Sequence, residues 1–126
     1  MSIQRFLVNI CSDNLVASRD FYVNVLGLTV GFESDWFIQL SELQGVLELG
    51  IIDRQHEMVP ETDQQLPQGT YLTFVVDDVE EAFQRAKDLS IEIVQSPQDT
   101  FYGQRRMLLR DPNGLLIDIS ALISKD

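Results

Sequence analysis

The sequence repeats one order of secondary-structure patterns, and this repetition restricts the possible folds more than any other feature. Each copy begins with a strand-like segment, continues with a helical pattern and ends with three more strand-like segments. In the first copy these segments span 6–11, 15–26, 28–33, 36–40 and 45–52. In the second copy they span 71–76, 79–89, 91–95, 102–110 and 115–120. The chain therefore contains a βαβββ unit twice.

The two copies also align with each other residue by residue. Residues 7–10 match 71–74 in pattern, and residues 46–49 match 116–119. Between the copies lies a polar stretch that contains Pro60 and Pro67 and shows no sustained period, as is typical of a connector. We therefore expect one domain over 1–126, within the usual size of a single domain. Module one spans 3–53, the connector 54–69 and module two 70–122.

Residues with strong local preferences mark the ends of the two predicted helices. A polar residue within 12–14 can cap the start of the first helix, and Gly27 follows its last turn. Asp77 or Asp78 can cap the second helix. The helical spacing predicts two buried stripes, which consist of Leu15, Ser18, Tyr22, Val25 and Leu26 in the first helix and Val79, Ala82, Phe83, Ala86 and Leu89 in the second.

The segment at 111–114, Asp-Pro-Asn-Gly, predicts a type I turn between the last two strands. Proline fixes the second turn position and glycine suits the fourth. We expect the strands to pair from Arg110 and Leu115 onward. This pairing puts Met107 directly opposite Asp118.

The composition excludes several classes of function. The chain has 20 acidic and 9 basic side chains and a formal charge of -11, so it lacks the clustered basic residues that a nucleic-acid surface needs. No uninterrupted apolar run approaches the roughly 18 residues that span a bilayer. The single cysteine excludes an internal disulfide, and the first residues lack the pattern of a signal peptide. We expect a soluble, cytoplasmic protein that binds a small molecule and neither nucleic acid nor membrane.

Alternation along the strands gives each sheet two faces. The large apolar set, expected to pack under the helices, is Phe6, Val8 and Ile10 with Leu72, Phe74 and Val76. The opposite face is mixed in polarity, as a concave surface lined for a ligand would be. We predict that this ligand-binding face contains Leu7, Asn9, Phe37, Gln39, Glu48, Tyr71, Thr73, Arg105, Met107 and Asp118.

Two carboxylates on this half-apolar face, Glu48 and Asp118, are the candidate catalytic residues. A buried carboxylate is costly unless a cation or hydrogen-bond donors compensate it. The pair can serve as metal ligands, as acid and base catalysts, or as anchors for a cationic ligand. The alternative is that both are solvated at an open mouth, or that Arg105 neutralises one of them.

The sequence resembles the vicinal oxygen chelate superfamily, which includes lactoylglutathione lyase, extradiol dioxygenases and bleomycin resistance proteins. The residues that carry the resemblance are 18–22, Ser-Arg-Asp-Phe-Tyr; 26–28, Leu-Gly-Leu; 76–79, Val-Asp-Asp-Val; 102–103, Tyr-Gly; and 111–118, Asp-Pro-Asn-Gly-Leu-Leu-Ile-Asp. The resemblance covers nearly the whole chain. It implies an α+β fold in which two tandem βαβββ modules form a curved eight-stranded mixed sheet, an open barrel or cup.

The resemblance also identifies the positions at which metal-using members place their ligands. These positions correspond to Leu7, Glu48, Tyr71 and Asp118. Leucine cannot coordinate a metal, and a neutral tyrosine is a poor ligand at pH 7. The single histidine, His56, has no counterpart in the family pattern and is expected to be an exposed loop residue. We therefore expect no metal and no other cofactor, with a divalent metal as the alternative.

Two functions remain open at this point. The first is metal-independent binding of a small molecule, such as a cationic or aromatic drug, in the manner of bleomycin resistance proteins. The second is an enzyme of lyase, dioxygenase or isomerase type that uses Glu48 and Asp118 with a divalent metal or as acid and base. Two further side chains have structural expectations: Cys11 as a small buried residue and Trp36 as a core residue on the helix side. The resemblance implies a homodimer.

Overall fold

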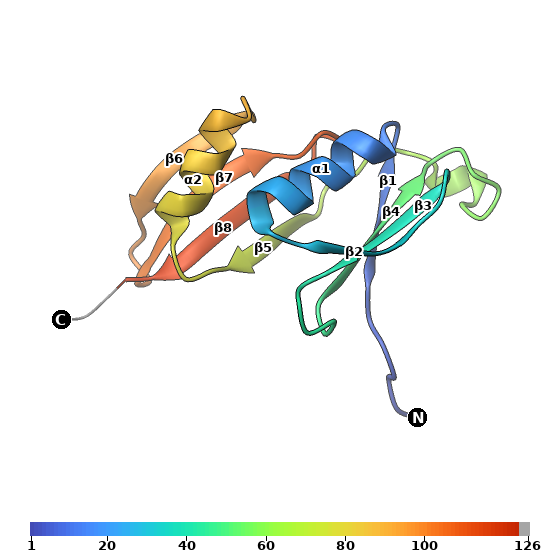
Figure 1. The fold of residues 1–126 in the computed structure, drawn as a ribbon, viewed down its shortest axis with the longest axis horizontal. Helices are drawn as coiled ribbons and strands as arrows, with labels where there is room; N and C mark the ends of the chain where they lie inside the picture. The colour runs from blue at the N-terminus through green and yellow to red at the C-terminus, as the bar shows by residue number, and fades with distance from the viewer. Residues whose placement is uncertain (124–126) are drawn as a thin grey trace. The chain divides into compact units, whose positions relative to one another are not determined.

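The computed structural model describes residues 1–123 of the chain. The chain divides into two compact units, the first spanning Met1–Pro67 and the second beginning at Gln68. Each unit contains one helix against one four-stranded mixed sheet (Figure 1). The predicted α+β class and the two βαβββ modules are confirmed. No helix in the part of the chain that the structure describes is long and apolar enough to cross a membrane.

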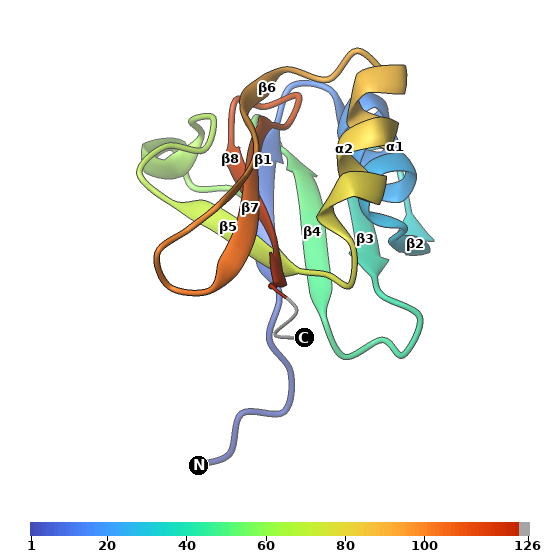
Figure 2. The same cartoon turned by 90° about the vertical axis from the view of Figure 1, so that its left-hand side faces the viewer.

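The first unit follows the predicted order of elements. Its strands are β1 (Val8–Ser12), β2 (Thr29–Glu33), β3 (Phe37–Ser41) and β4 (Glu48–Asp53), its α-helix is α1 (Leu15–Leu26), and its 3-10 helix is η1 (Glu61–Asp63). The sheet order is β1-β4-β3-β2, with β1 parallel to β4 and the other pairs antiparallel. Figure 2 shows β1, β4 and β3 side by side in this order.

Helix α1 begins and ends where local chemistry predicts. The side chain of Asn14 accepts a hydrogen bond from the backbone N–H of Ala17 at 3.0 Å, and Gly27 ends the helix at a φ of 71°. The helix buries Ser18, Phe21, Tyr22 and Val25 against β3 and β4.

At β1 and α1, two side chains differ from the sequence prediction. Phe6 was expected under the helix, but it precedes the first residue of β1 and its side chain is exposed. Phe21 was missing from the predicted stripe and is fully buried with an edge-to-face contact to Tyr22. Helix spacing allows this position because residues 18, 21, 22 and 25 share one face.

The second unit repeats the arrangement. Its elements are β5 (Tyr71–Val75), α2 (Val79–Asp88), β6 (Ile93–Asp99), β7 (Gln104–Arg110) and β8 (Leu116–Leu122), with the sheet order β5-β8-β7-β6. Asp78 caps α2 by accepting the N–H of Glu80 at 3.0 Å. The helix buries Val79, Ala82 and Ala86, whereas Leu89 follows its last residue and is exposed. The prediction for Leu89 is therefore wrong.

The final hairpin forms the predicted turn but pairs one residue out of the predicted register. The N–H of Gly114 donates to the carbonyl of Asp111 at 3.1 Å, as in a type I turn. Gly114 then adopts a left-handed φ of 83°, so the first strand pair is Arg110 with Leu116. The extra residue in the loop shifts every pair along the hairpin.

This shift overturns the predicted placement of Met107 and Arg105 on the ligand-binding face. Met107 pairs with Ile119 and is fully buried on the helix side of the sheet. Arg105 is on the same side, because its guanidinium forms an ion pair with Glu80 of α2. Strand β7 presents Arg106 and Leu108 beside Asp118 instead.

Candidate functional site

Three residues of the first unit form a polar group that we call the Glu48 cluster: Arg5, Gln39 and Glu48. Arg5 holds both carboxylate oxygens, with Nε donating to Oε2 at 2.7 Å and Nη2 to Oε1 at 2.5 Å. The Nε2 of Gln39 donates to the same Oε1 at 2.9 Å. The Glu48 side chain is only 9% exposed, so these donors replace water around a carboxylate at the start of β4.

The electrostatic consequence is that the ionised form of Glu48 is favoured. The hydrogen bonds from Arg5 hold the pKa of this carboxyl below its usual value, while partial burial acts in the opposite direction. Arg5 lies in the segment before β1 and neutralises Glu48, whereas the alternative drawn from the sequence was that Arg105 neutralises one of the two carboxylates. The segment before β1 has no periodic pattern. The only sequence signal for this ion pair is therefore Arg5 itself, a basic residue close to a predicted strand.

Around this cluster the strand register puts the predicted residues of the first unit on one face of the sheet, and the binding of a ligand there stays a prediction. Asn9 and Gln39 are the register partners of Gly50, and Phe37 is the partner of Ile52. Gly50 provides the space for its neighbours, because a Cβ there would lie 2.8–2.9 Å from the Phe37 ring and would also meet the Asn9 amide oxygen. Leu7 lies one residue before β1, and extension of the β1–β4 register by one residue puts it opposite Glu48.

Aromatic side chains adjoin the Glu48 cluster. Phe37 packs edge-to-face with Phe32, at 6.4 Å between ring centroids, and it also contacts Trp36. Phe32 is about half exposed, so one ring of this group lies at the surface. Such rings can stack against a planar ligand.

Four residues of the second unit form the Asp118 cluster: Thr73, Arg106, Asp118 and Ser120. Ser120 Oγ donates to Asp118 Oδ1 at 2.7 Å, and Thr73 Oγ1 donates to Oδ2 at 3.1 Å. The Nε of Arg106 lies 3.3 Å from Oδ2. Asp118 is buried, with 7% of its side chain exposed.

The register separates Tyr71 from Asp118. Strand β5 pairs Thr73 with Asp118, and it pairs Tyr71 with Leu116, two residues earlier on both strands. The predicted residues Thr73 and Asp118 are thus brought together, and Tyr71 stands apart with about half of its surface exposed. Sequence reasoning missed Arg106 because it used the wrong register for β7, whereas Ser120 follows Asp118 by two residues on β8 and could have been found by alternation.

The donor set of either unit does not match a metal centre of the family type. Within residues 1–123 no three histidine, cysteine, aspartate or glutamate side chains cluster in a way that could hold a metal ion. Glu48 is occupied by Arg5 and Gln39, and Asp118 by two hydroxyls and a guanidinium. The position before β1 holds Leu7, which has no donor atom.

His56 is half-buried rather than exposed, and its ring stacks on Trp36 at a centroid distance of 3.9 Å. Its Nδ1 accepts the backbone N–H of Met58 at 3.1 Å. Trp36 is likewise half-buried and precedes β3, so it is not the core residue that alternation predicted. The stack joins the connector, which contains His56, to the residue that precedes β3.

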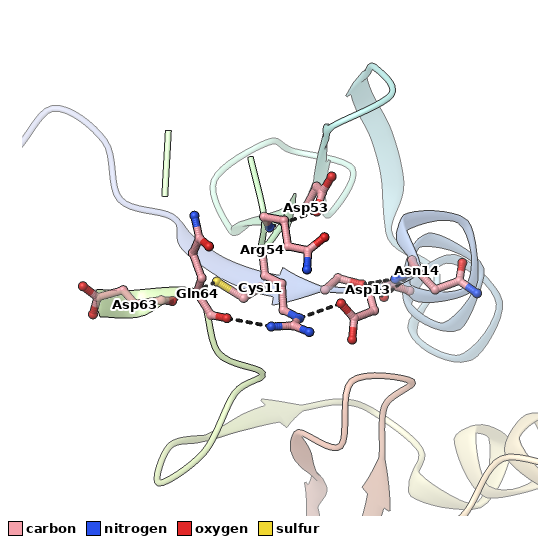
Figure 3. Close-up of polar contacts among 10 residues, drawn as sticks. Cys11, Asp13, Asn14, Asp53, Arg54, Asp63 and Gln64 are labelled. Atoms are coloured by element: carbon pink, nitrogen blue, oxygen red, sulfur yellow. Dashed lines mark hydrogen bonds and ion pairs between the residues drawn. The ribbon is translucent and has the colours of Figure 1, made fainter. Parts of the chain in front are cut away.

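Cys11 lies in a polar network that ties the connector to β1 (Figure 3). Arg54 donates to Asp13 Oδ1 at 2.6 Å and to the carbonyl of Gln64 at 2.8 Å. The Cys11 thiol is half-buried, 3.7 Å from the carbonyl of Asp63. Burial, and then the charge of Asp63, raises the pKa of this thiol, so it is not an activated nucleophile.

Comparisons with known proteins agree on the fold. Residues 3–119 match the family model described as Glyoxalase/Bleomycin resistance protein/Dioxygenase superfamily. A family enzyme from Burkholderia phytofirmans PsJN has a TM-score of 0.78 and 23% identity, with 93% of this chain and 97% of that chain covered. A lactoylglutathione lyase from Agrobacterium tumefaciens has a TM-score of 0.71 and 21% identity, with 96% of each chain covered. No curated protein matches the sequence.

Proposed function

Because the chain belongs to the Glyoxalase/Bleomycin resistance protein/Dioxygenase superfamily, we propose that it binds a small molecule without using a metal. The observation that supports this most directly is the state of the two carboxylates at the family positions. Glu48 is held by Arg5 and Asp118 is held beside Arg106. In both units an arginine contacts the carboxylate at the position that corresponds to a family metal ligand.

A metal would have to displace strong interactions to reach Glu48. Both carboxylate oxygens already accept charge-assisted hydrogen bonds from Arg5, and one of them also accepts from Gln39. A divalent ion bound here would leave the Arg5 guanidinium without its partner and would gain no donor from Leu7. The same reasoning applies to a cationic ligand, which must compete with Arg5 for the one carboxylate of this cluster.

The ligand class that fits the first unit best is therefore aromatic. Phe32 and Phe37 form a partly exposed aromatic pair near Asn9, and the polar cluster supplies an amide and an ion pair at its edge. An aromatic ring can pack on this surface while its polar substituents meet Asn9 or Gln39.

The test is elemental analysis of natively purified protein, followed by a thermal-shift screen of Ni²⁺, Zn²⁺, Mn²⁺ and a panel of aromatic compounds. We expect no stoichiometric metal, no stabilisation by metals and stabilisation by members of the panel. Phe37→Ala should weaken the shift produced by a panel member. The matched control is Phe101→Ala, because Phe101 is fully exposed in a turn and should leave the shift unchanged.

The opposite result would contradict the proposal clearly. Stoichiometric metal in the purified protein, or stabilisation by a metal that Glu48→Gln abolishes, would assign Glu48 to a metal centre. If the aromatic compounds stabilise Phe37→Ala as much as they stabilise the wild type, Phe37 is not part of the binding surface.

A further inference from the structure

We infer that Arg106 anchors the carboxylate of a small organic acid on the sheet face of the second unit. This inference goes beyond the proposed function, which concerns the aromatic surface of the first unit. It concerns the Asp118 cluster alone and uses no residue of the first unit.

The first observation is that Arg106 has unused hydrogen-bond donors. Among the arginines of residues 1–123, each of the other six donates a hydrogen bond from its guanidinium, namely Arg5, Arg19, Arg54, Arg85, Arg105 and Arg110. The Nε of Arg106 is buried and makes no hydrogen bond of acceptable geometry in the described structure. This Nε faces Asp118 Oδ2 at 3.3 Å as an ion pair, so the donors that Arg106 can offer to a ligand are its terminal nitrogens.

The second observation is how Asp118 holds the guanidinium. The aspartate already accepts hydrogen bonds from Thr73 and Ser120, and it meets Arg106 only at Nε, at 3.3 Å. The two hydroxyls stabilise the negative charge of Asp118, and that charge in turn keeps Arg106 at the cluster. The terminal nitrogens of Arg106 remain available to a second anion, and a planar carboxylate matches their paired geometry.

The third observation is the surroundings of Arg106. It pairs with Ser120, which pairs with Val75 on the other side, so these three residues form one row across the sheet. Val75 is exposed and Arg106 retains 25% of its side-chain surface, so a small molecule can reach this row from solvent. Val75 offers apolar contact for the carbon skeleton of an acid, and Arg106 offers the charge for its carboxylate.

The experiment is a titration with benzoate, compared with the neutral analogue benzamide and with inorganic phosphate. The arginine Nε–H resonances of the wild type are followed by NMR, and the affinities of the variants are measured at fixed ionic strength. We expect benzoate to shift the Arg106 resonance, and benzamide to leave it unchanged. Arg106→Gln should weaken benzoate binding about tenfold or more, and Arg106→Lys should weaken it less, since lysine keeps the charge but loses the paired donors.

The control is Arg110→Gln, which removes a cation from the same strand and the same face. Arg110 donates to the carbonyl of Gly114 and should not affect benzoate affinity. Equal affinity of the wild type and Arg106→Gln for benzoate would overturn the inference. If Arg106→Gln does not fold, an unshifted Arg106 resonance in the wild type would overturn it as well. Phosphate binding stronger than benzoate binding would refute the carboxylate assignment.

The two proposals fail in different ways. An Arg106 resonance that benzoate does not shift, together with stabilisation by aromatic compounds that Phe37→Ala weakens, would refute the role of Arg106 and leave the proposed function intact. Stoichiometric metal in the purified protein would refute metal-independence, whatever benzoate does to the Arg106 resonance.

Discussion

Arg5 and Glu48 form a two-point ion pair, with Nε–Oε2 at 2.7 Å and Nη2–Oε1 at 2.5 Å. The arginine lies outside every strand, whereas the glutamate opens β4. The pair therefore attaches the segment before β1 to the sheet. It also satisfies a carboxylate that is almost completely covered.

This ion pair predicts a pH-dependent stability. The folded-state pKa of Glu48 is below its value in the unfolded chain, so the ionised carboxylate stabilises the fold above the unfolded pKa. That contribution is lost as the pH falls through the folded-state pKa. Arg5→Gln should lower the free energy of unfolding near neutral pH, and the difference from the wild type should vanish in acid. Urea unfolding between about pH 3 and pH 7 measures this.

A suitable control for this prediction is Arg85→Gln. The ion pair of Arg85 with Glu81 is exposed on α2, so its loss should cost little at any pH. A difference between the wild type and Arg5→Gln that stays constant down to the lowest pH would contradict the assignment of the effect to Glu48.

Asp118→Asn should destabilise the second unit more than an exposed substitution of the same kind. The asparagine keeps the shape and can still accept from Ser120 or Thr73, but it leaves Arg106 without a counter-charge. We expect a loss of about 1 to 3 kcal/mol in the free energy of unfolding. Asp99→Asn removes an exposed partner of Arg105 and should cost about 1 kcal/mol or less. Equal losses in urea unfolding would mean that Asp118 is not compensated by its neighbours.

The sequence predicts the elements of this protein better than it predicts the contacts between their side chains. Caps and turns depend on a few adjacent residues, which is why Asn14, Gly27 and Asp78 behave as expected. The pairing of β7 with β8 depends on one added loop residue at Gly114, and a shift of one residue moves every side chain to the other face.

In the candidate site, too, the sequence predicts which residues share a face but does not predict the partners of the two carboxylates. The face that carries Asn9, Phe37, Gln39 and Glu48 follows from alternation along short strands, and the structure confirms it. The partners of the carboxylates could not be found by this route. Arg5 belongs to no periodic segment, so only folding brings it to Glu48.

Gly50→Ala should be costly, because the site is built around the missing side chain. A Cβ at this position would meet the Asn9 amide oxygen and lie 2.8–2.9 Å from the Phe37 ring. We expect a loss of about 1 to 3 kcal/mol in the free energy of unfolding. Gly31→Ala is the comparison, since its Cβ would displace the Gln39 amide from Glu48 but would not meet the Phe37 ring. Restoration of stability by Phe37→Leu in the Gly50→Ala background would identify the ring as the obstacle, and no loss in Gly50→Ala would refute this packing.

The stack of His56 on Trp36 predicts a spectroscopic signal from the only tryptophan of the chain. The rings lie 3.9 Å apart between centroids and are nearly parallel, at 9°, so the imidazole shields one face of the indole from water. His56→Ala should expose that face and shift the tryptophan emission to longer wavelength. His56→Phe keeps a flat ring over the indole but removes the Nδ1 that accepts the N–H of Met58. We therefore expect His56→Phe to retain emission near that of the wild type while losing about 1 kcal/mol of stability. An identical emission maximum in His56→Ala and the wild type would show that the two rings are not stacked in solution.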